Sequence, residues 1–218
     1  MSRTENAGRL TQSTPLLVFP CNGNALEAID CLGDAFRLVG FIDDTPQKQG
    51  IGPVGLPVLT RQALQQWPDA KVLAIPGSPT SFRTRRTAID SLNLPPERFA
   101  TVVHPSARIS PLATIGHNVL IMAGVVVTSN AVIGDHVCVL PNTVVHHDAT
   151  IGAWSLVGSN VTVAGGVGIG ENCYVGSGTS IMNGLQIGAR SLIGLGTTVI
   201  RDCPADSVLA GNPARSLR

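Results

Sequence analysis

The sequence predicts an α/β domain with a parallel sheet, followed by an all-β domain wound as a parallel β-helix of hexapeptide repeats. Two observations carry this prediction. Up to about His104, short apolar runs alternate with helix-like segments. From Arg108 onward, isoleucine or valine recurs at every sixth residue. The 218 residues suffice for one large domain or two small ones.

The first part of the chain alternates expected strands with expected helices. The apolar run PLLVF reads as a buried strand, and we expect Asn24 to cap the helix that follows it. Strands and helices that alternate at this spacing predict a parallel sheet with right-handed crossovers. The expected strands span residues 15–19, 36–44, 70–77 and 99–105, and the expected helices span residues 24–34, 60–67 and 78–92.

The second part of the chain carries an unbroken six-residue period. All sixteen positions taken at steps of six from Ile109 to Val199 are isoleucine or valine. This period excludes an α-helix, which repeats at about 3.6 residues, and a coiled coil, which repeats at about 3.5. It is typical of a parallel β-helix in which three hexads close one triangular coil, here for about five coils. Each Ile or Val should point inward and stack on its counterpart three hexads later.

Charge and hydropathy exclude several classes of function. The formal charge of +1 and the pI of about 7.7 give no electrostatic case for binding nucleic acid or an anionic membrane. The longest apolar runs are far shorter than the roughly 20 residues that span a bilayer. Residues 1–14 are polar, lack the apolar core of a signal peptide and are expected to be a disordered leader.

The cysteines indicate a reducing compartment. The five of them are dispersed and show no C-x-x-C spacing, which predicts reduced thiols in the cytoplasm. Cys173 occupies an inward position of its hexad, so we expect it to be an inert packing residue. We therefore expect no cysteine nucleophile.

The stretch TVVHHDATIG places His146, His147 and Asp148 in a region that otherwise has little charge. An imidazole, with its pKa near ~6.5, is suited to remove a proton at neutral pH, and an adjacent carboxylate can fix its tautomer. On this interpretation His147 is a general base. The spacing is equally typical of polar residues that decorate the outside of a turn.

A zinc site is the competing interpretation of the histidines. Zinc would need three convergent ligands, and the sequence offers no such set. His117 and His136 are close to the register of the coil but miss it by one residue. We therefore expect no metal.

The N-terminal domain shows a weak signal for phosphate binding. In VFPCNGNALEA a strand leads into a helix, whose N-terminal amides favour an anion, but Gly23 is the only glycine of a G-x-G-x-x-G pattern. Asp43 and Asp44 end the second strand at the edge where ligands of such sheets bind, or are simply a solvated strand end. Arg83, Arg85 and Arg86 either reach phosphates or form a solvated helix face.

The chain resembles the left-handed β-helix acyltransferases that carry a small Rossmann-like N-terminal domain. Members of this family N-acetylate nucleotide-linked amino sugars or O-acetylate sialic acid. The resemblance covers nearly everything after residue 15 and implies a nucleotide-sugar-binding domain at residues 15–105 and an acyltransferase domain at residues 106–218. It rests on the domain order, the hexads and the motifs GFIDD (40–44), HPSA (104–107), PNTVVHHDATIG (141–152) and LAGNPARSL (209–217).

The resemblance also implies a set of site residues and a homotrimer with acetyl-CoA in the groove between neighbouring subunits. It places the base at His147, with Asp148 as its acidic partner. Substrate binding falls on Asn22, Gly23, Asn24, Asp43, Asp44 and Gly77. Acetyl-CoA binding falls on Leu156, Gly165, Gly176, Ser177, Gly194 and Leu195, with amides around Gly165 able to polarise the thioester carbonyl.

The chain departs from the family at three positions. Pro20 stands where the family usually has glycine, Asn24 where it has histidine, and Leu156 where it often has a second histidine. The leading hypothesis remains an acetyl-CoA-dependent N-acetyltransferase that acts on the amino group of a UDP-, dTDP- or GDP-linked deoxyamino sugar. The alternatives are O-acetylation of sialic acid or another glycan, and a sugar-nucleotide-binding scaffold with weak or lost chemistry.

Overall fold

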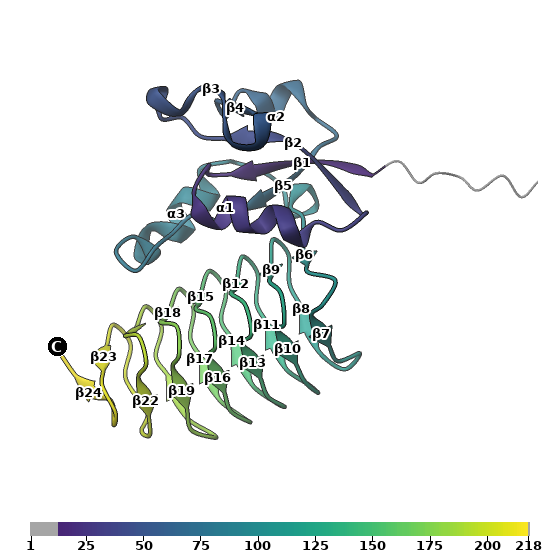
Figure 1. The fold of residues 1–218 in the computed structure, drawn as a ribbon. Coiled ribbons are helices and arrows are strands. Elements are labelled where there is room, and N and C mark those ends of the chain that lie inside the picture. The colour runs from purple at the N-terminus through teal and green to yellow at the C-terminus, as the bar shows by residue number, and fades with distance from the viewer. Residues whose placement is uncertain (1–12, 218) are drawn as a thin grey trace, which may run out of the picture.

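The computed structural model describes residues 13–217 and consists of an α/β domain that sits on one side of a long β-helix (Figure 1). Of the expected leader at residues 1–14, only Ser13 and Thr14 lie within the described residues. Thr14 begins the first strand.

The α/β domain is built on a five-stranded sheet with the strand order β3-β4-β2-β1-β5. All neighbouring pairs are parallel except β3 and β4, which are antiparallel, so the sheet is mixed where the sequence predicted a parallel one. β3 and β4 were both missed, since β3 has only two residues, both exposed, and β4 has only three and begins with a proline. The strands are β1 (Thr14–Phe19), β2 (Phe36–Ile42), β3 (Gly50–Ile51), β4 (Pro57–Leu59) and β5 (Lys71–Ala74).

The three α-helices of this domain lie where helices were expected but are shorter, and three of its five 3-10 helices were not expected. The first begins one residue before Asn24, and its N-cap is Asn22, whose side chain accepts a hydrogen bond from the amide of Ala25. The α-helices are α1 (Gly23–Glu27), α2 (Ala63–Gln66) and α3 (Arg85–Asp90). The 3-10 helices are η1 (Ala28–Cys31), η2 (Pro46–Lys48), η3 (Pro53–Gly55), η4 (Phe82–Thr84) and η5 (Pro96–Arg98). Within residues 13–217, every helix is too short or too polar to cross a membrane.

The last strand expected in the α/β domain belongs mainly to the other domain. Phe99 forms a single bridge with Val72, but β6 (Val102–Val103) pairs in parallel with β9 (Leu120–Ile121) of the β-helix. The boundary expected between residues 105 and 106 lies after β6 and before β7 (Arg108–Ile109), so a strand that pairs with the β-helix precedes it.

The β-helix has three sheets whose strands pair in parallel with their counterparts one coil later, except for the last pair of the eight-stranded sheet, β23 and β24, which is antiparallel. The six-stranded sheet adds β10 (Val126–Val127), β13 (Val144–Val145), β16 (Thr162–Val163), β19 (Ser180–Ile181) and β22 (Thr198–Val199) to β7. The five-stranded sheet holds β8 (Thr114–Ile115), β11 (Val132–Ile133), β14 (Thr150–Ile151), β17 (Gly168–Ile169) and β20 (Gln186–Ile187). The eight-stranded sheet adds β12 (Cys138–Val139), β15 (Leu156–Val157), β18 (Tyr174–Val175), β21 (Leu192–Ile193), β23 (Val208–Ala210) and β24 (Arg215–Ser216) to β6 and β9.

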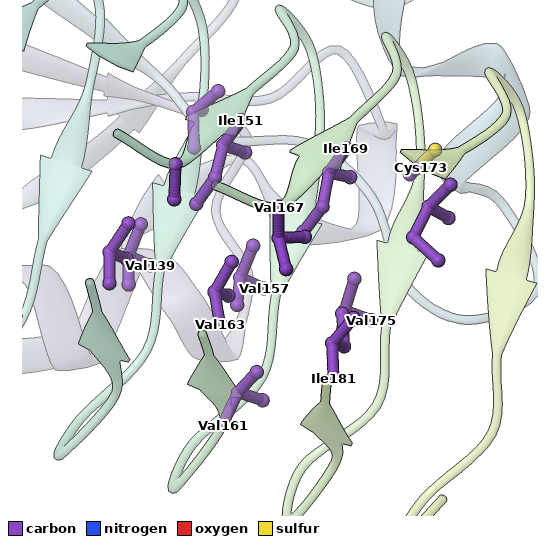
Figure 2. Packing of buried hydrophobic residues seen from close by; sticks show 14 of the residues in the cluster. Val139, Ile151, Val157, Val161, Val163, Val167, Ile169, Cys173, Val175 and Ile181 are labelled. Carbon is purple, nitrogen blue, oxygen red and sulfur yellow. The ribbon is translucent and has the colours of Figure 1, made fainter. Parts of the chain in front are cut away.

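The predicted isoleucine and valine columns form the core of the β-helix. Figure 2 shows Val139, Val157 and Val175 stacked one coil apart, and each is at most 1% exposed. In the first coil the pattern is weaker, since Ile109 and Ile115 are only partly buried. The inward stacking predicted from the hexads is thus confirmed for the coils that have a neighbour on both sides.

The outward residues of the eight-stranded sheet contact the α/β domain. Leu120, Cys138 and Leu156 share one buried cluster with Leu73 and Phe82. Hydrogen bonds also join the two domains. The Asn118 side chain accepts a hydrogen bond from the amide of Ala74 at 2.7 Å and donates one to the Ala74 carbonyl at 2.8 Å. This sheet is therefore covered by the α/β domain, while the corner between the other two sheets lies on the opposite side of the prism (Figure 1).

Candidate active site

His147 and Asp148 form a hydrogen-bonded pair on an exposed turn. The turn joins β13 to β14, at the corner between the six-stranded and five-stranded sheets. His147 Nδ1 lies 2.7 Å from Asp148 Oδ2, and the two side chains are 62% and 58% exposed. When Nδ1–H donates to the carboxylate, Nε2 carries the free lone pair. The pair thus has the arrangement that a general base requires.

The backbone of the turn sets the direction of the Asp148 side chain. Asp148 has φ of 60°, and Asn130, Gly166 and Gly184 occupy the equivalent left-handed position in neighbouring coils. Aspartate, asparagine and glycine tolerate this conformation best. Asn130 Nδ2 donates to Asp148 Oδ1 at 3.0 Å. The bond from His147, followed by the bond from Asn130, lowers the pKa of Asp148, so the carboxylate is ionised at neutral pH.

Gly165 lies directly against the imidazole, one coil after His147. A Cβ on Gly165 would lie 2.7 Å from both Nε2 and Cε1 of His147, so only glycine leaves room for the ring in this position. Within the described residues, the Gly165 amide donates no hydrogen bond, while its carbonyl accepts from Gly184. An amide donor is therefore free beside the base.

Four of the residues that were expected to bind acetyl-CoA lie at a different corner of the prism from His147. Gly176, Ser177, Gly194 and Leu195 lie on the turns between the eight-stranded and six-stranded sheets. These turns stack closely, since a Cβ on Gly176 would lie 2.7 Å from the Leu195 nitrogen. Within one chain, the width of the six-stranded sheet separates this corner from His147.

Leu156 lies beneath the α/β domain and is only 6% exposed. Its Cδ1 would be 2.9 Å from a Cβ on Gly77, which places the two residues in tight contact. Both line a cavity of about 180 Å³ between the domains, together with Asn24. The structure thus brings Asn24, Gly77 and Leu156 together, on the side of the prism away from His147.

The remaining residues expected to bind substrate are engaged within the α/β domain. Asn22 caps α1, and its Nδ2 lies 3.4 Å from the carbonyl oxygen of Ile75. Asp43 is 5% exposed and pairs with Lys48 at 2.7 Å, and Asp44 pairs with Arg61 at 2.5 Å. Gly23 begins α1 and has open space at its Cβ.

Asn22 also lines a second cavity at this edge of the sheet. It has a volume of about 300 Å³. The other lining residues are Cys21, Leu26, Lys48, Gly52, Pro53 and Val58. The carboxylates of Asp43 and Asp44 are not among the groups that line it.

The three arginines of α3 and the turn before it mainly serve structural contacts. Arg85 is 1% exposed and donates to the carbonyls of Pro76 and His136, and its burial lowers its pKa to about 10. Arg86 lies over the Trp154 ring at 4.4 Å from its centroid. Arg83 donates to the carbonyl of Arg190 at 3.3 Å. Arg85 in particular fits neither expectation, because a solvated face and a phosphate site both require exposure.

The buried cysteines and His136 show packing roles. Burial raises the pKa of Cys173 to about 11, which keeps the thiol protonated. His136 is stacked on Trp154, and its Nδ1 lies 2.9 Å from Asn118 Nδ2. Among residues 13–217, no three histidine, cysteine or acidic side chains converge as metal ligands do.

Sequence reasoning missed the other residues that line the interdomain cavity. Leu140, Tyr174, Ser78 and Pro79 were not assigned to a site. Leu156 and Tyr174 are register partners on neighbouring strands and project from the same face of the sheet. The sequence held a signal for this surface, since the outward positions aligned with Leu156 at steps of eighteen residues are mostly large and apolar.

The comparisons with known proteins agree with this architecture. The family model described as bacterial transferase hexapeptide, six repeats, matches residues 112–147 and 130–165. No curated protein matches the chain.

Several solved structures match nearly the whole chain. PerB from Caulobacter crescentus, in complex with CoA and GDP-perosamine, is 26% identical with a TM-score of 0.82, over 97% of this chain and 100% of PerB. The acetyltransferase domain of PglB from Neisseria gonorrhoeae, in complex with acetyl coenzyme A, is 26% identical with a TM-score of 0.83, over 94% of this chain and 100% of that domain. The chain therefore contains a bacterial transferase hexapeptide region, and nearly its whole length is similar to PerB and to the acetyltransferase domain of PglB.

Proposed function

We propose that the protein is an acetyl-CoA-dependent N-acetyltransferase that acts on the amino group of a nucleotide-linked deoxyamino sugar. The hydrogen-bonded His147–Asp148 pair beside the free amide of Gly165 carries this proposal. The ligands of the similar structures support the substrate class, since PerB holds CoA and GDP-perosamine and the PglB domain holds acetyl coenzyme A.

The reaction follows from the free lone pair on His147 Nε2. The neutral amine attacks the thioester carbonyl, and Nε2 takes the proton that the nitrogen loses as the C–N bond forms. Asp148 stabilises the resulting imidazolium, and the Gly165 amide donates to the oxyanion. The C–S bond then breaks, and the imidazolium returns its proton to the sulfur of CoA. The products are the acetamido sugar and free CoA.

We propose that each site is built from two subunits of a homotrimer. The cavity that contains Asn24, Gly77 and Leu156 lies on the eight-stranded sheet, and His147 lies at the corner opposite that sheet. One chain therefore cannot present a sugar from its own cavity to its own His147. A neighbouring subunit can supply the imidazole, with acetyl-CoA in the groove between the two.

A panel of UDP-, dTDP- and GDP-linked amino sugars with acetyl-CoA tests the function. Because His147 supplies the base, His147→Ala should lower kcat by roughly 100-fold or more while acetyl-CoA still raises the melting temperature. Loss of a histidine need not prevent ligand binding in such proteins. Variants of the Caulobacter enzyme with one histidine replaced by alanine or asparagine still hold CoA and GDP-perosamine. Turnover within a few-fold of wild type would remove the mechanism.

Two other outcomes would replace the proposed activity. Transfer to hydroxyl acceptors but not to amino sugars would make the protein an O-acetyltransferase with the same base. The absence of any melting shift with acetyl-CoA at millimolar concentration would favour a binding scaffold.

A further inference from the structure

The interdomain cavity has one apolar wall and few polar groups. Leu140, Leu156 and Val157 of the β-helix line it, and Gly77, Ser78 and Pro79 of the α/β domain lie across from them. A volume of about 180 Å³ suits a group the size of one monosaccharide ring with its substituents. Gly158 and two side chains from different domains, Asn24 and Tyr174, complete the lining.

Two of the three polar side chains in this lining are free to bind a ligand. The Ser78 hydroxyl is already engaged with the hydroxyls of Thr80 and Ser81, at 3.0 and 2.9 Å. Within residues 13–217, the side chains of Asn24 and Tyr174 make no hydrogen bond. Unpaired donors in a confined cavity gain the most from a ligand that pairs with them.

The position of the Tyr174 ring is fixed without the use of its hydroxyl. The ring lies 6.0 Å from that of Phe82, at an interplanar angle of 45°, and it pairs in register with Leu156 on the neighbouring strand. Burial raises the pKa of Tyr174, so the hydroxyl is a protonated donor at neutral pH. A rigid ring therefore holds a donor at the border of an apolar wall.

We propose that Tyr174 is a specificity-determining residue whose hydroxyl hydrogen-bonds a ring hydroxyl of the acceptor sugar, while Leu140 and Leu156 contact the deoxygenated edge of the same ring. The inference rests on the proposed function and adds the contacts that select the sugar. The wall rejects a hydroxyl in place of a hydrogen or methyl group, because that hydroxyl would be buried without a partner. Asn24 supplies a second polar contact from the α/β domain.

Tyr174→Phe tests the hydrogen bond while keeping the ring that packs on Phe82. The probes are GDP-perosamine and the UDP- and dTDP-linked amino sugars of the panel. For the best acceptor, kcat/KM should fall roughly 3- to 10-fold through KM, the loss expected for one neutral hydrogen bond. The KM for acetyl-CoA and the melting temperature should not change, whereas a merely structural role would shift the melting temperature and spare the acceptor KM.

Leu156→Ser tests the apolar wall with paired acceptors. The wild type should prefer a 6-deoxy amino sugar to its 6-hydroxy counterpart on the same nucleotide, and the variant should reduce that preference at least 5-fold. Unchanged acceptor kcat/KM in Tyr174→Phe, or an unchanged preference in Leu156→Ser, overturns the inference. If His147→Ala still loses turnover in that case, the proposed function stands and only the sugar contacts are wrong.

Discussion

At the scale of single residues, the candidate site combines the exposed side chains of His147 and Asp148 with the restrained backbone of the turn that carries them. The His147–Asp148 pair could be expected from the adjacent residues, since neighbours on a turn can reach each other. The sequence does not show that Gly165 lies against the ring, because this contact arises only when the coil closes. It also gives no sign that Asp43 and Asp44 are paired with Lys48 and Arg61.

Asp148→Asn tests the acidic partner of the base at this scale. Asparagine keeps the left-handed backbone, as Asn130 does in the preceding coil with φ of 59°, so the fold should be unaffected. Loss of the carboxylate removes the charge that stabilises the imidazolium, so kcat should fall roughly 10- to 100-fold. Steady-state kinetics at saturating acetyl-CoA measures this loss.

The matched control is Asn130→Gly, which removes the second hydrogen bond to Asp148 but keeps its charge and tolerates the left-handed backbone at position 130. Its kcat should stay within about 3-fold of wild type, as expected for one exposed hydrogen bond. If both variants lose activity equally, Asp148 acts by shaping the turn and not by its charge.

At the scale of elements, the β-helix was predictable and the α/β domain was predictable only in outline. The hexad period specifies inward stacking because each coil repeats the contacts of the one before. The short helices and β3 depend on local caps and edges, and the N-cap proved to be Asn22 instead of Asn24 because its side chain reaches the amide of Ala25. Helix termini are where sequence patterns carry least information.

The glycines of the turns provide a test of how tightly the coils stack. A Cβ on Gly152 would lie 2.5 Å from the nitrogen of Glu171 and the carbonyl carbon of Gly170, which are backbone atoms of the next coil. Gly152→Ala should therefore destabilise the protein by about 1–3 kcal/mol, seen as a lower melting temperature.

Gly196→Asn is the control for this substitution. Gly196 has φ of 62° and open space at its Cβ, and Asn142 and Asn160 occupy the same turn position in earlier coils with φ of 61° and 55°. Its melting temperature should stay within about 2 °C of wild type. A larger loss in Gly196→Asn than in Gly152→Ala would show that the backbone conformation, and not coil stacking, limits these turns.

At the scale of the whole molecule, the position of the α/β domain decides what each face of the prism can do. It covers the eight-stranded sheet, with Arg85 bonded across the contact to the carbonyl of His136. It thereby creates the cavity lined by Leu156 and leaves the opposite corner, with His147, exposed. Two halves of the proposed site are then separated by the body of the prism.

Subunit complementation tests this separation. His147→Ala removes the base, and Ser78→Trp should fill the interdomain cavity, so each variant alone should be inactive. If the site is shared between subunits, mixed trimers should show roughly a third of wild-type activity, because one of the three base–cavity pairs in each mixed trimer has both halves intact. Activity of tagged, co-purified mixed trimers is the measurement.

The controls for complementation are each variant purified alone and the two mixed after separate assembly. Neither should show the restored activity. If co-expressed mixed trimers stay inactive although both variants keep the wild-type melting temperature, base and cavity serve the same site within one chain, contrary to the proposal.

The sequence by itself determined the β-helix, its inward columns and the turn that carries His147 and Asp148. The reason is that a six-residue repeat specifies, from local sequence alone, which residue of each hexad points inward and which lies on a turn. Only the tertiary structure decided that Leu156 packs under Gly77, that Arg85 is buried, and that Tyr174 borders a cavity. These contacts join segments far apart in the chain. The outward positions of the eight-stranded sheet are the most apolar of the three sheets, as Leu120, Leu156 and Leu192 show, but this does not specify which residues of the α/β domain meet them. The physical reason is that docking of one domain on another depends on the shape and charge of whole surfaces, which no short period encodes.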